Sequence, residues 1–258
     1  MSRRTVVLRV SYDGARFSGF ARQPGLRTVQ GELEGALATA LRCPVEIEGA
    51  GRTDAGVHAL GQVVSFPETG VEPEPASLAR SLNALTGDDL VVRSVEWANA
   101  GFSARRSALG REYRYFLAPG AVPPLFARGT AWWVKRPLDL ERMREAAGLL
   151  LGEHDFAAFC AAESVSKGPT RRRIDALEIA TAREMGEHLI GIRVVGNAFL
   201  HSMVRIIVGS LVEVGVGRRD AEWLRCALES RRRERAGPTA PAHGLVLWHV
   251  FYPEECWL

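Results

Sequence analysis

The sequence has few of the features that mark a membrane, metal-binding or disulfide-stabilised protein. None of its apolar runs approaches the roughly 18 residues that span a bilayer. No pair of histidines has the His-x-x-x-His spacing, and no Cys-x-x-Cys pair occurs among the four cysteines, Cys43, Cys160, Cys226 and Cys256. Structural metals and disulfide frameworks rely on such patterns. We therefore expect neither a metal site nor a disulfide framework.

The N-terminal segment lacks the apolar core of a secretion signal, because Arg9 and Asp13 interrupt it. We accordingly expect a cytoplasmic protein. Its 258 residues, of which 47% are hydrophobic and 24% charged, exclude a disordered, collagen-like or coiled-coil chain. This length suits two modest domains or one large one.

Lysine is nearly absent. Lys135 and Lys167 are the only two, so 31 of the 33 basic residues are arginine. The guanidinium group binds phosphate through paired hydrogen bonds and stacks on bases, which suits an RNA partner. A GC-rich genome would produce the same bias, however, and composition alone favours that explanation. The net charge of +3 is too small to decide the matter.

The hydrophobic pattern predicts the same order of elements twice. In the first half we expect strands at 5–12, 45–48, 62–66 and 90–97, with helices after Thr28 and Pro75. In the second half we expect strands at 111–117, 174–180, 189–195 and 245–252, with helices after Asp139, at 199–216 and at 221–230. The repeated order, β-α-β-β-α-β, is the ferredoxin-like arrangement.

The predicted fold is therefore α+β: two ferredoxin-like halves with mainly antiparallel sheets and an active cleft between them. We place the first half at residues 1–104 and the second at 105–258. No repeat of individual residues supports this duplication, which depends on the order of elements alone.

The segment at residues 49–58, GAGRTDAGVH, joins two expected strands and is the first candidate for chemistry. Its glycines allow the backbone to approach a ligand closely. A guanidinium folded back from Arg52 would keep Asp54 ionised, and an ionised carboxylate can act as a nucleophile or a base. Asp-x-Gly is also ordinary turn chemistry, and by itself the turn is the simpler interpretation.

The expected helix at 199–216 is the second candidate. It is apolar on nearly every side, which predicts burial, and it carries Arg205. A buried guanidinium needs an anion, and no acid lies three or four residues away along this helix. Asp54 is our candidate partner. A purely structural ion pair and a side chain that extends to solvent remain open alternatives.

The strand at 111–117 is the third candidate. Its period of two places Arg111, Tyr113 and Tyr115 on one face. Aromatic rings between arginines can stack on a base and hold its phosphate. A core aromatic with a hydroxyl that reaches the surface would give the same pattern and is favoured by the strand alone.

Five segments together resemble one enzyme family. They are YDGARFSGF at 12–20, GRTDAGVHALGQVVSF at 51–66, REYRY at 111–115, FLHSMVRIIVG at 199–209 and TAPAHGLVLWHVFYP at 239–253. In this order they are similar to the tRNA pseudouridine synthase A family, and GRTDAGVH is the most specific of them. The resemblance implies that Asp54 is catalytic, that Tyr113 contacts the target uracil and that Arg205 pairs with Asp54.

The resemblance also implies a homodimer without a cofactor that modifies uridines at tRNA positions 38, 39 and 40. This sequence departs from the family pattern at three places: Ser202 replaces a frequent histidine, Ile206 a frequent asparagine and Ala21 a frequent glutamine. These departures leave the three implied site residues untouched. They concern finer RNA contacts and the choice of uridine.

Pseudouridine formation is an isomerisation, so it requires no redox cofactor, ATP or metal, and the sequence lacks the corresponding motifs. Asp54 could add to C1′ or remove the 2′ proton. Two other functions remain to be weighed. A non-catalytic RNA-binding protein with two RRM-like sheets is disfavoured because the aromatic RNP1 pattern is missing. A hydrolase using Asp54 with Glu46 or Glu48 is disfavoured because both glutamates sit regularly on a strand.

Overall fold

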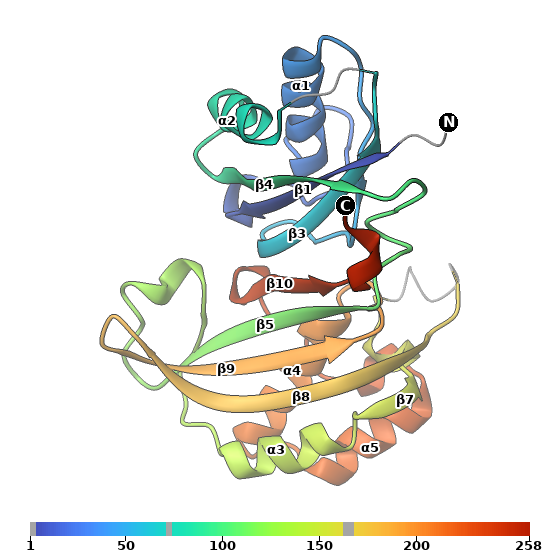
Figure 1. Ribbon diagram of the computed structural model, residues 1–258. Coiled ribbons are helices and arrows are strands. Elements are labelled where there is room, and N and C mark those ends of the chain that lie inside the picture. The colour runs from blue at the N-terminus through green and yellow to red at the C-terminus, as the bar shows by residue number, and fades with distance from the viewer. Residues whose placement is uncertain (1–3, 71–73, 162–167) are drawn as a thin grey trace. The chain divides into compact units, whose positions relative to one another are not determined.

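The computed structural model describes residues 4–70, 74–161 and 168–258 (Figure 1). The chain forms two compact units. Unit 1 comprises Met1–Arg111 and Leu247–Leu258, and unit 2 comprises Glu112–Val246. Both contain helices and largely antiparallel strands, so the protein is α+β. Within the described residues, no helix has the length and apolar character needed to cross a membrane.

Unit 1 has the predicted order of elements. These are β1 (Thr5–Tyr12), α1 (Val29–Leu41), β2 (Glu48–Gly49), β3 (His58–Pro67), α2 (Pro75–Leu85) and β4 (Leu90–Ala98). Strand β1 lies between β3 and β4 and is antiparallel to both. Strand β2 adds to the far side of β3, also antiparallel. The strands of unit 1 therefore follow the order β4-β1-β3, and β2 pairs with β3 outside this order.

Helix α1 forms for the reasons that its sequence indicates. The Thr28 hydroxyl accepts a hydrogen bond from the Gly31 amide and caps the first turn. Four apolar residues at four-residue intervals are buried against the sheet, namely Val29, Leu33, Leu37 and Leu41. The helix ends at Leu41, and the next residue, Arg42, adopts a left-handed conformation.

Strand β2 is shorter than predicted. The sequence indicates a strand at 45–48, but only Glu48–Gly49 pairs with β3. Two side chains of α1 form hydrogen bonds with the backbone of Ile47. The Ile47 amide donates to the Glu34 carboxylate at 3.2 Å, and the Ile47 carbonyl accepts from the Gln30 side-chain amide at 3.2 Å. Ile47 therefore has its hydrogen bonds satisfied without a strand partner.

Unit 2 contains the remaining elements. These are β5 (Gly110–Pro119), β6 (Trp132–Val134), α3 (Leu140–Gly148), β7 (Gly152–Asp155), β8 (Arg171–Glu184), β9 (Glu187–Gly196), α4 (Met203–Gly215) and α5 (Ala221–Ser230). The sheet has the order β5-β9-β8-β7, with the short strand β6 parallel to β5. Helix α3 packs against α4 and α5 (Figure 1). The sequence pattern did not indicate β6 and β7, which have only three and four residues.

The C-terminal segment belongs to unit 1. Strand β10 (Leu245–Phe251) starts in unit 2, and from Leu247 onward it lies with unit 1 next to β3. The Leu109 amide donates to the Phe251 carbonyl at 2.8 Å, and Trp257 forms a bridge with Ala98. The units thus differ from the predicted division into 1–104 and 105–258, because residues 247–258, distant in sequence, belong to unit 1.

Candidate active site

Asp54 lies in the connection between β2 and β3, and hydrogen bonds fix both ends of this connection. At its start the Ala50 amide donates to the Val63 carbonyl at 2.8 Å, and the Gln62 side chain donates to the Gly51 carbonyl at 2.8 Å. Beyond Asp54, the chain turns and the Val57 amide donates to the Asp54 carbonyl at 3.1 Å. The Asp54 side chain is half-buried at the beginning of this turn. We call residues 50–57 the aspartate loop.

A buried hydroxyl pair holds the aspartate loop to β1. The oxygens of the Tyr12 and Thr53 hydroxyl groups are 2.8 Å apart, and Gln62 Nε2 lies 3.4 Å from the Tyr12 oxygen. All three side chains are buried. Burial raises the pKa of Tyr12 to about 12, because it disfavours the phenolate. The residue directly before Asp54 is thus fixed by its own side chain.

The segment after β1 packs directly on the aspartate loop. The Phe20 amide donates to the Thr53 carbonyl at 3.0 Å. Gly19 has a φ of +95°, and a Cβ at this position would lie 3.0 Å from the same carbonyl. At Gly14 a Cβ would overlap the carbonyl of Val57. Both approaches require glycine, which explains two glycines of the YDGARFSGF segment.

Arg111 holds the base of the aspartate loop. Its Nη2 donates to the carbonyls of Ala50 and Arg105, each at 2.8 Å, and its Nε lies 3.3 Å from the Ala50 carbonyl. The residue is 9% exposed. Much of its donor capacity is therefore used by the backbone of unit 1, whereas Arg52 on the loop itself is exposed. The substrate-binding roles given to both arginines stay predictions.

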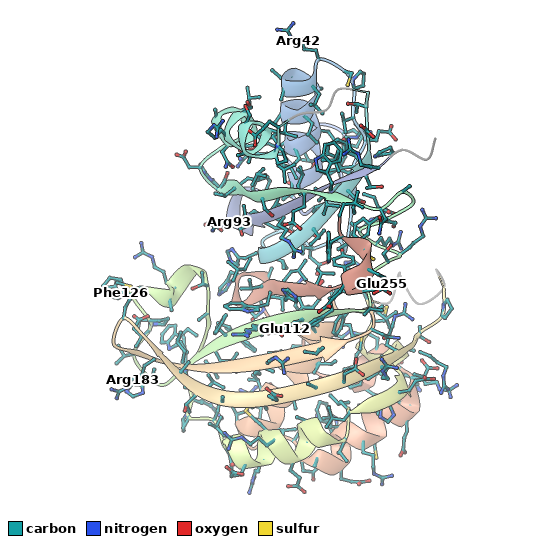
Figure 2. The ribbon with its side chains drawn as sticks, viewed as in Figure 1. Arg42, Arg93, Glu112, Phe126, Arg183 and Glu255 are labelled. Carbon is teal, nitrogen blue, oxygen red and sulfur yellow. The ribbon has the colours of Figure 1, made fainter. Side chains whose placement is uncertain are left out.

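On strand β5 the two tyrosines differ in their surroundings. Tyr115 is fully buried, its hydroxyl donates to the Pro241 carbonyl at 2.8 Å, and burial raises its pKa well above the usual range. It is a core aromatic. Tyr113 is 8% exposed and packs edge-to-face on Phe199, with ring centroids 5.1 Å apart at 83°. Glu112, which precedes Tyr113 and is labelled in Figure 2, forms ion pairs with Arg114 at 2.8 Å and with Arg193 at 3.1 Å.

Arg205 is less buried than the sequence indicates. Helix α4 begins at Met203 rather than at 199, and apart from Arg205 its first three turns are buried. Arg205 itself is half-buried, and its Nε donates to the Ala240 carbonyl at 2.8 Å. The surroundings of Arg205 are therefore not apolar on every side, because its guanidinium donates a hydrogen bond to a backbone carbonyl of a distant segment. The pairing of Arg205 with Asp54, which belong to different units, stays a prediction.

Two glycines bring this distant segment onto α4. The Gly237 amide donates to the Ser210 hydroxyl at 2.9 Å, and a Cβ on Gly237 would lie 2.7 Å from the Ser210 Cα. A Cβ on Gly209 of α4 would overlap the Pro238 carbonyl, so this close approach requires glycine. The Ala240 amide then donates to the Arg205 carbonyl at 3.1 Å. Residues 237–240, which lead into the C-terminal sequence motif, therefore hold the backbone and the side chain of Arg205.

The positions of Glu46 and Glu48, considered above as partners of Asp54 in a hydrolase, bear on a second catalytic acid. The Glu48 carboxylate accepts a hydrogen bond from the Ser103 hydroxyl, and Glu46 is exposed. Neither arrangement suggests a second catalytic acid. In the described part of the chain, no three His, Cys, Asp or Glu side chains gather closely enough to hold a metal ion.

Sequence reasoning found the aspartate loop but missed what supports it. Tyr12, Thr53 and Gln62 received no role, although each is a polar residue in or beside a strand that turned out to be buried. A signal was available, since all three residues belong to the first two of the five segments that carry the family resemblance.

Comparison with known proteins defines the class of this protein as an RNA-modifying isomerase, because the profile of the tRNA pseudouridine synthase family matches residues 9–100 and 146–253. The matched residues include Asp54 and Arg205. The chain belongs to the tRNA pseudouridine synthase family.

Three relatives, each named tRNA pseudouridine synthase A, match nearly the whole chain. The protein from Bacillus subtilis is 42% identical over 247 residues, which cover 94% of this chain and 97% of the relative. That from Geobacillus kaustophilus is 43% identical over 248 residues, or 96% and 94%. That from Burkholderia cenocepacia is 45% identical over 253 residues, or 97% and 90%. This similarity gives the chain the isomerase activity of the family.

Proposed function

We propose that this protein converts uridine to pseudouridine in the anticodon stem-loop of tRNA, at positions 38, 39 and 40, with Asp54 as the reacting carboxylate. The reaction breaks the N1–C1′ bond and joins C1′ to C5, while C5 loses a proton and N1 gains one. No atoms enter or leave overall. Asp54 would add to C1′ or remove the 2′ proton, and both routes need an ionised carboxylate.

The fixed main chain of the aspartate loop is the observation that carries this proposal. Backbone groups of Ala50, Gly51, Thr53, Asp54 and Gly56 all have hydrogen-bond partners within unit 1. A carboxylate on such a loop keeps its position before the substrate arrives, so little entropy is lost during the reaction. A flexible turn that merely reverses the chain would not need buried contacts from β1, Gly19 and Arg111.

The proposal gives supporting roles to residues of unit 2. The target uridine has to leave its stack, at a cost of a few kcal/mol, and the Tyr113 ring would receive its face. The edge-to-face contact with Phe199 supports this role because it holds the ring in one orientation. Arg205 would stabilise the charge of Asp54, and Arg52 and Arg111 would contact the RNA. We also propose a cytoplasmic homodimer that acts on tRNA without a cofactor.

The test is substitution of the carboxylate by its isosteric amide. Asp54→Asn should lower pseudouridine formation in an unmodified tRNA transcript by at least about 100-fold. It should leave the Kd for that transcript within about twofold. Carbodiimide mapping identifies each modified uridine. Asp88→Asn, at an exposed aspartate of unit 1, is the matched control and should keep full activity. Near wild-type turnover by Asp54→Asn would refute the proposal, and a pure RNA-binding protein would leave every uridine unchanged.

A further inference from the structure

The segment that follows β4 presents two arginines on a firmly held backbone. Phe102, Ser103 and Ala104 are buried, whereas the next two residues, Arg105 and Arg106, are exposed. A connection between two strands is usually exposed and mobile. The burial of three consecutive residues indicates that this one has a fixed place in unit 1.

Side chains from three elements hold this segment. The Tyr252 hydroxyl donates to the Ala104 carbonyl at 2.6 Å, and the Ala104 amide donates to the Ser65 hydroxyl at 2.9 Å. The Ser103 hydroxyl binds the Glu48 carboxylate and also accepts from the Arg106 amide at 2.9 Å. The main chain beneath the two exposed guanidinium groups is therefore fixed.

Arg111 joins this segment to the aspartate loop. The same Nη2 atom lies 2.8 Å from the Arg105 carbonyl and 2.8 Å from the Ala50 carbonyl. Arg105 is thus next to the base of the loop, and Arg52 follows Ala50 by two residues. Three exposed arginines, Arg52, Arg105 and Arg106, consequently belong to one region of unit 1.

The charges of these three arginines are not neutralised locally. Across residues 4–70, 74–161 and 168–258, none of their guanidinium groups has a hydrogen-bond or ion-pair partner. Other arginines of unit 1 are paired, such as Arg9 with Glu96 at 2.9 Å and Arg27 with Asp89 at 2.7 Å. The nearby acid Glu48 already accepts a hydrogen bond from Ser103. This region therefore favours an anion supplied by a partner.

We propose that Arg105 and Arg106, together with Arg52, bind backbone phosphates of the tRNA close to the nucleotide presented to Asp54. This inference rests on the proposed function and names a phosphate site for it. One guanidinium group can bind a phosphate through two parallel hydrogen bonds. Such contacts fix the register of a nucleic acid without recognising its sequence. Because the backbone is already fixed, no ordering of the main chain adds to the entropy cost of binding.

The salt dependence of binding tests the proposal. The double variant Arg105→Gln/Arg106→Gln keeps polar side chains of similar reach but removes two charges. We expect the slope of log K against log salt concentration for an unmodified tRNA transcript to become shallower by about 1.4 to 1.8, or about 0.7 to 0.9 for each lost phosphate contact. KM should rise at least about tenfold, while kcat at saturating tRNA stays within about twofold, since neither residue touches the reacting atoms.

Arg42→Gln is the matched control. Arg42 is exposed and follows the last residue of α1 (Figure 2), and among the residues that the structure describes its side chain has no hydrogen-bond or ion-pair partner. Its substitution should leave both the slope and KM unchanged. Arg105→Lys/Arg106→Lys, which preserves the charges, should restore most of the slope. An unchanged slope in the double glutamine variant, or an equal change in Arg42→Gln, would overturn the proposal.

Two further measurements keep the result interpretable. Circular dichroism and thermal unfolding establish that each variant is folded. If the double variant is unstable, the single variant Arg106→Gln replaces it, with an expected slope change of about 0.7 to 0.9. Binding is measured independently of turnover. A wild-type protein that forms no pseudouridine would refute the proposed function, while the slope would still decide the phosphate site.

Discussion

The hydroxyl groups of Tyr12 and Thr53 are 2.8 Å apart in the interior of unit 1. Tyr12 is the last residue of β1, and Thr53 directly precedes Asp54. Because both side chains are buried, this hydrogen bond is shielded from water and is costly to break. The position of the Asp54 backbone is thereby tied to the central strand of the sheet.

Alkaline pH should destabilise the protein through Tyr12. Burial raises its pKa to about 12, whereas tyrosine in the unfolded chain has a pKa of about 10. The unfolded chain therefore releases this proton first, and stability that is complete below pH 10 is lost as the pH rises toward 12. Between those values Tyr12 should lower the free energy of unfolding by up to about 1.4 kcal/mol per pH unit. Urea unfolding at pH 9, 10 and 11 measures this slope.

Tyr12→Phe is the control for that slope. It removes the titrating group and leaves the Thr53 hydroxyl without its partner, so the variant should be about 1 kcal/mol less stable at pH 7 but lose less stability above pH 10. Burial also raises the pKa values of Tyr115 and Tyr252, which contribute in both proteins and cancel in the comparison. Parallel profiles for the two proteins would contradict this role of Tyr12.

A methyl group at Gly19 should disturb the aspartate loop. Gly19→Ala would place Cβ 3.0 Å from the Thr53 carbonyl in a conformation with φ of +95°. We expect a loss of about 1–2 kcal/mol in stability and at least a tenfold fall in kcat. Gly35→Ala is the matched control, because Gly35 is exposed in the middle of α1 with open space around it. That substitution should stabilise the protein by about 0.5–1 kcal/mol without changing kcat. Equal kcat values for both variants would argue against a fixed loop.

The ring of Tyr113 should matter more than its hydroxyl. Tyr113→Phe keeps the edge-to-face contact with Phe199 and the face available to a base. Tyr113→Ala removes both, so its kcat/KM should fall at least about tenfold below that of the phenylalanine variant. Steady-state kinetics on the tRNA transcript provides the comparison. Similar losses of kcat/KM in the two variants would indicate that the hydroxyl group, rather than the ring, is needed for activity.

Local sequence features predicted the elements of unit 1 well. The spacing of Leu33, Leu37 and Leu41 and the Thr28 cap identify α1, because a helix of this kind is specified by neighbours in the chain. The strand predicted at 45–48 is longer than the observed β2, because contacts with residues distant in the sequence limit its length. Glu34 and Gln30 of α1 take the hydrogen bonds of Ile47, and this competition between distant residues leaves no local pattern.

The candidate site was only partly predictable for the same reason. Motifs predict Asp54 and Tyr113 as site residues, but they do not predict the hydrogen bonds from Tyr12, Gln62 and Arg111 that hold the aspartate loop. Arg205 was expected to have apolar surroundings because its helix neighbours are apolar. The Ala240 carbonyl that meets it belongs to a segment 35 residues later in the chain.

The membership of Leu247–Leu258 in unit 1 has a consequence for biosynthesis. A ribosome that has released residues up to Arg111 has not yet made the strand that lies next to β3, so the first sheet stays incomplete while all of unit 2 is translated. Pairings over such long sequence separations form slowly. The nascent chain must therefore keep an open sheet edge soluble until translation has passed Phe251, and premature termination before that point would damage the half of the molecule that was synthesised first.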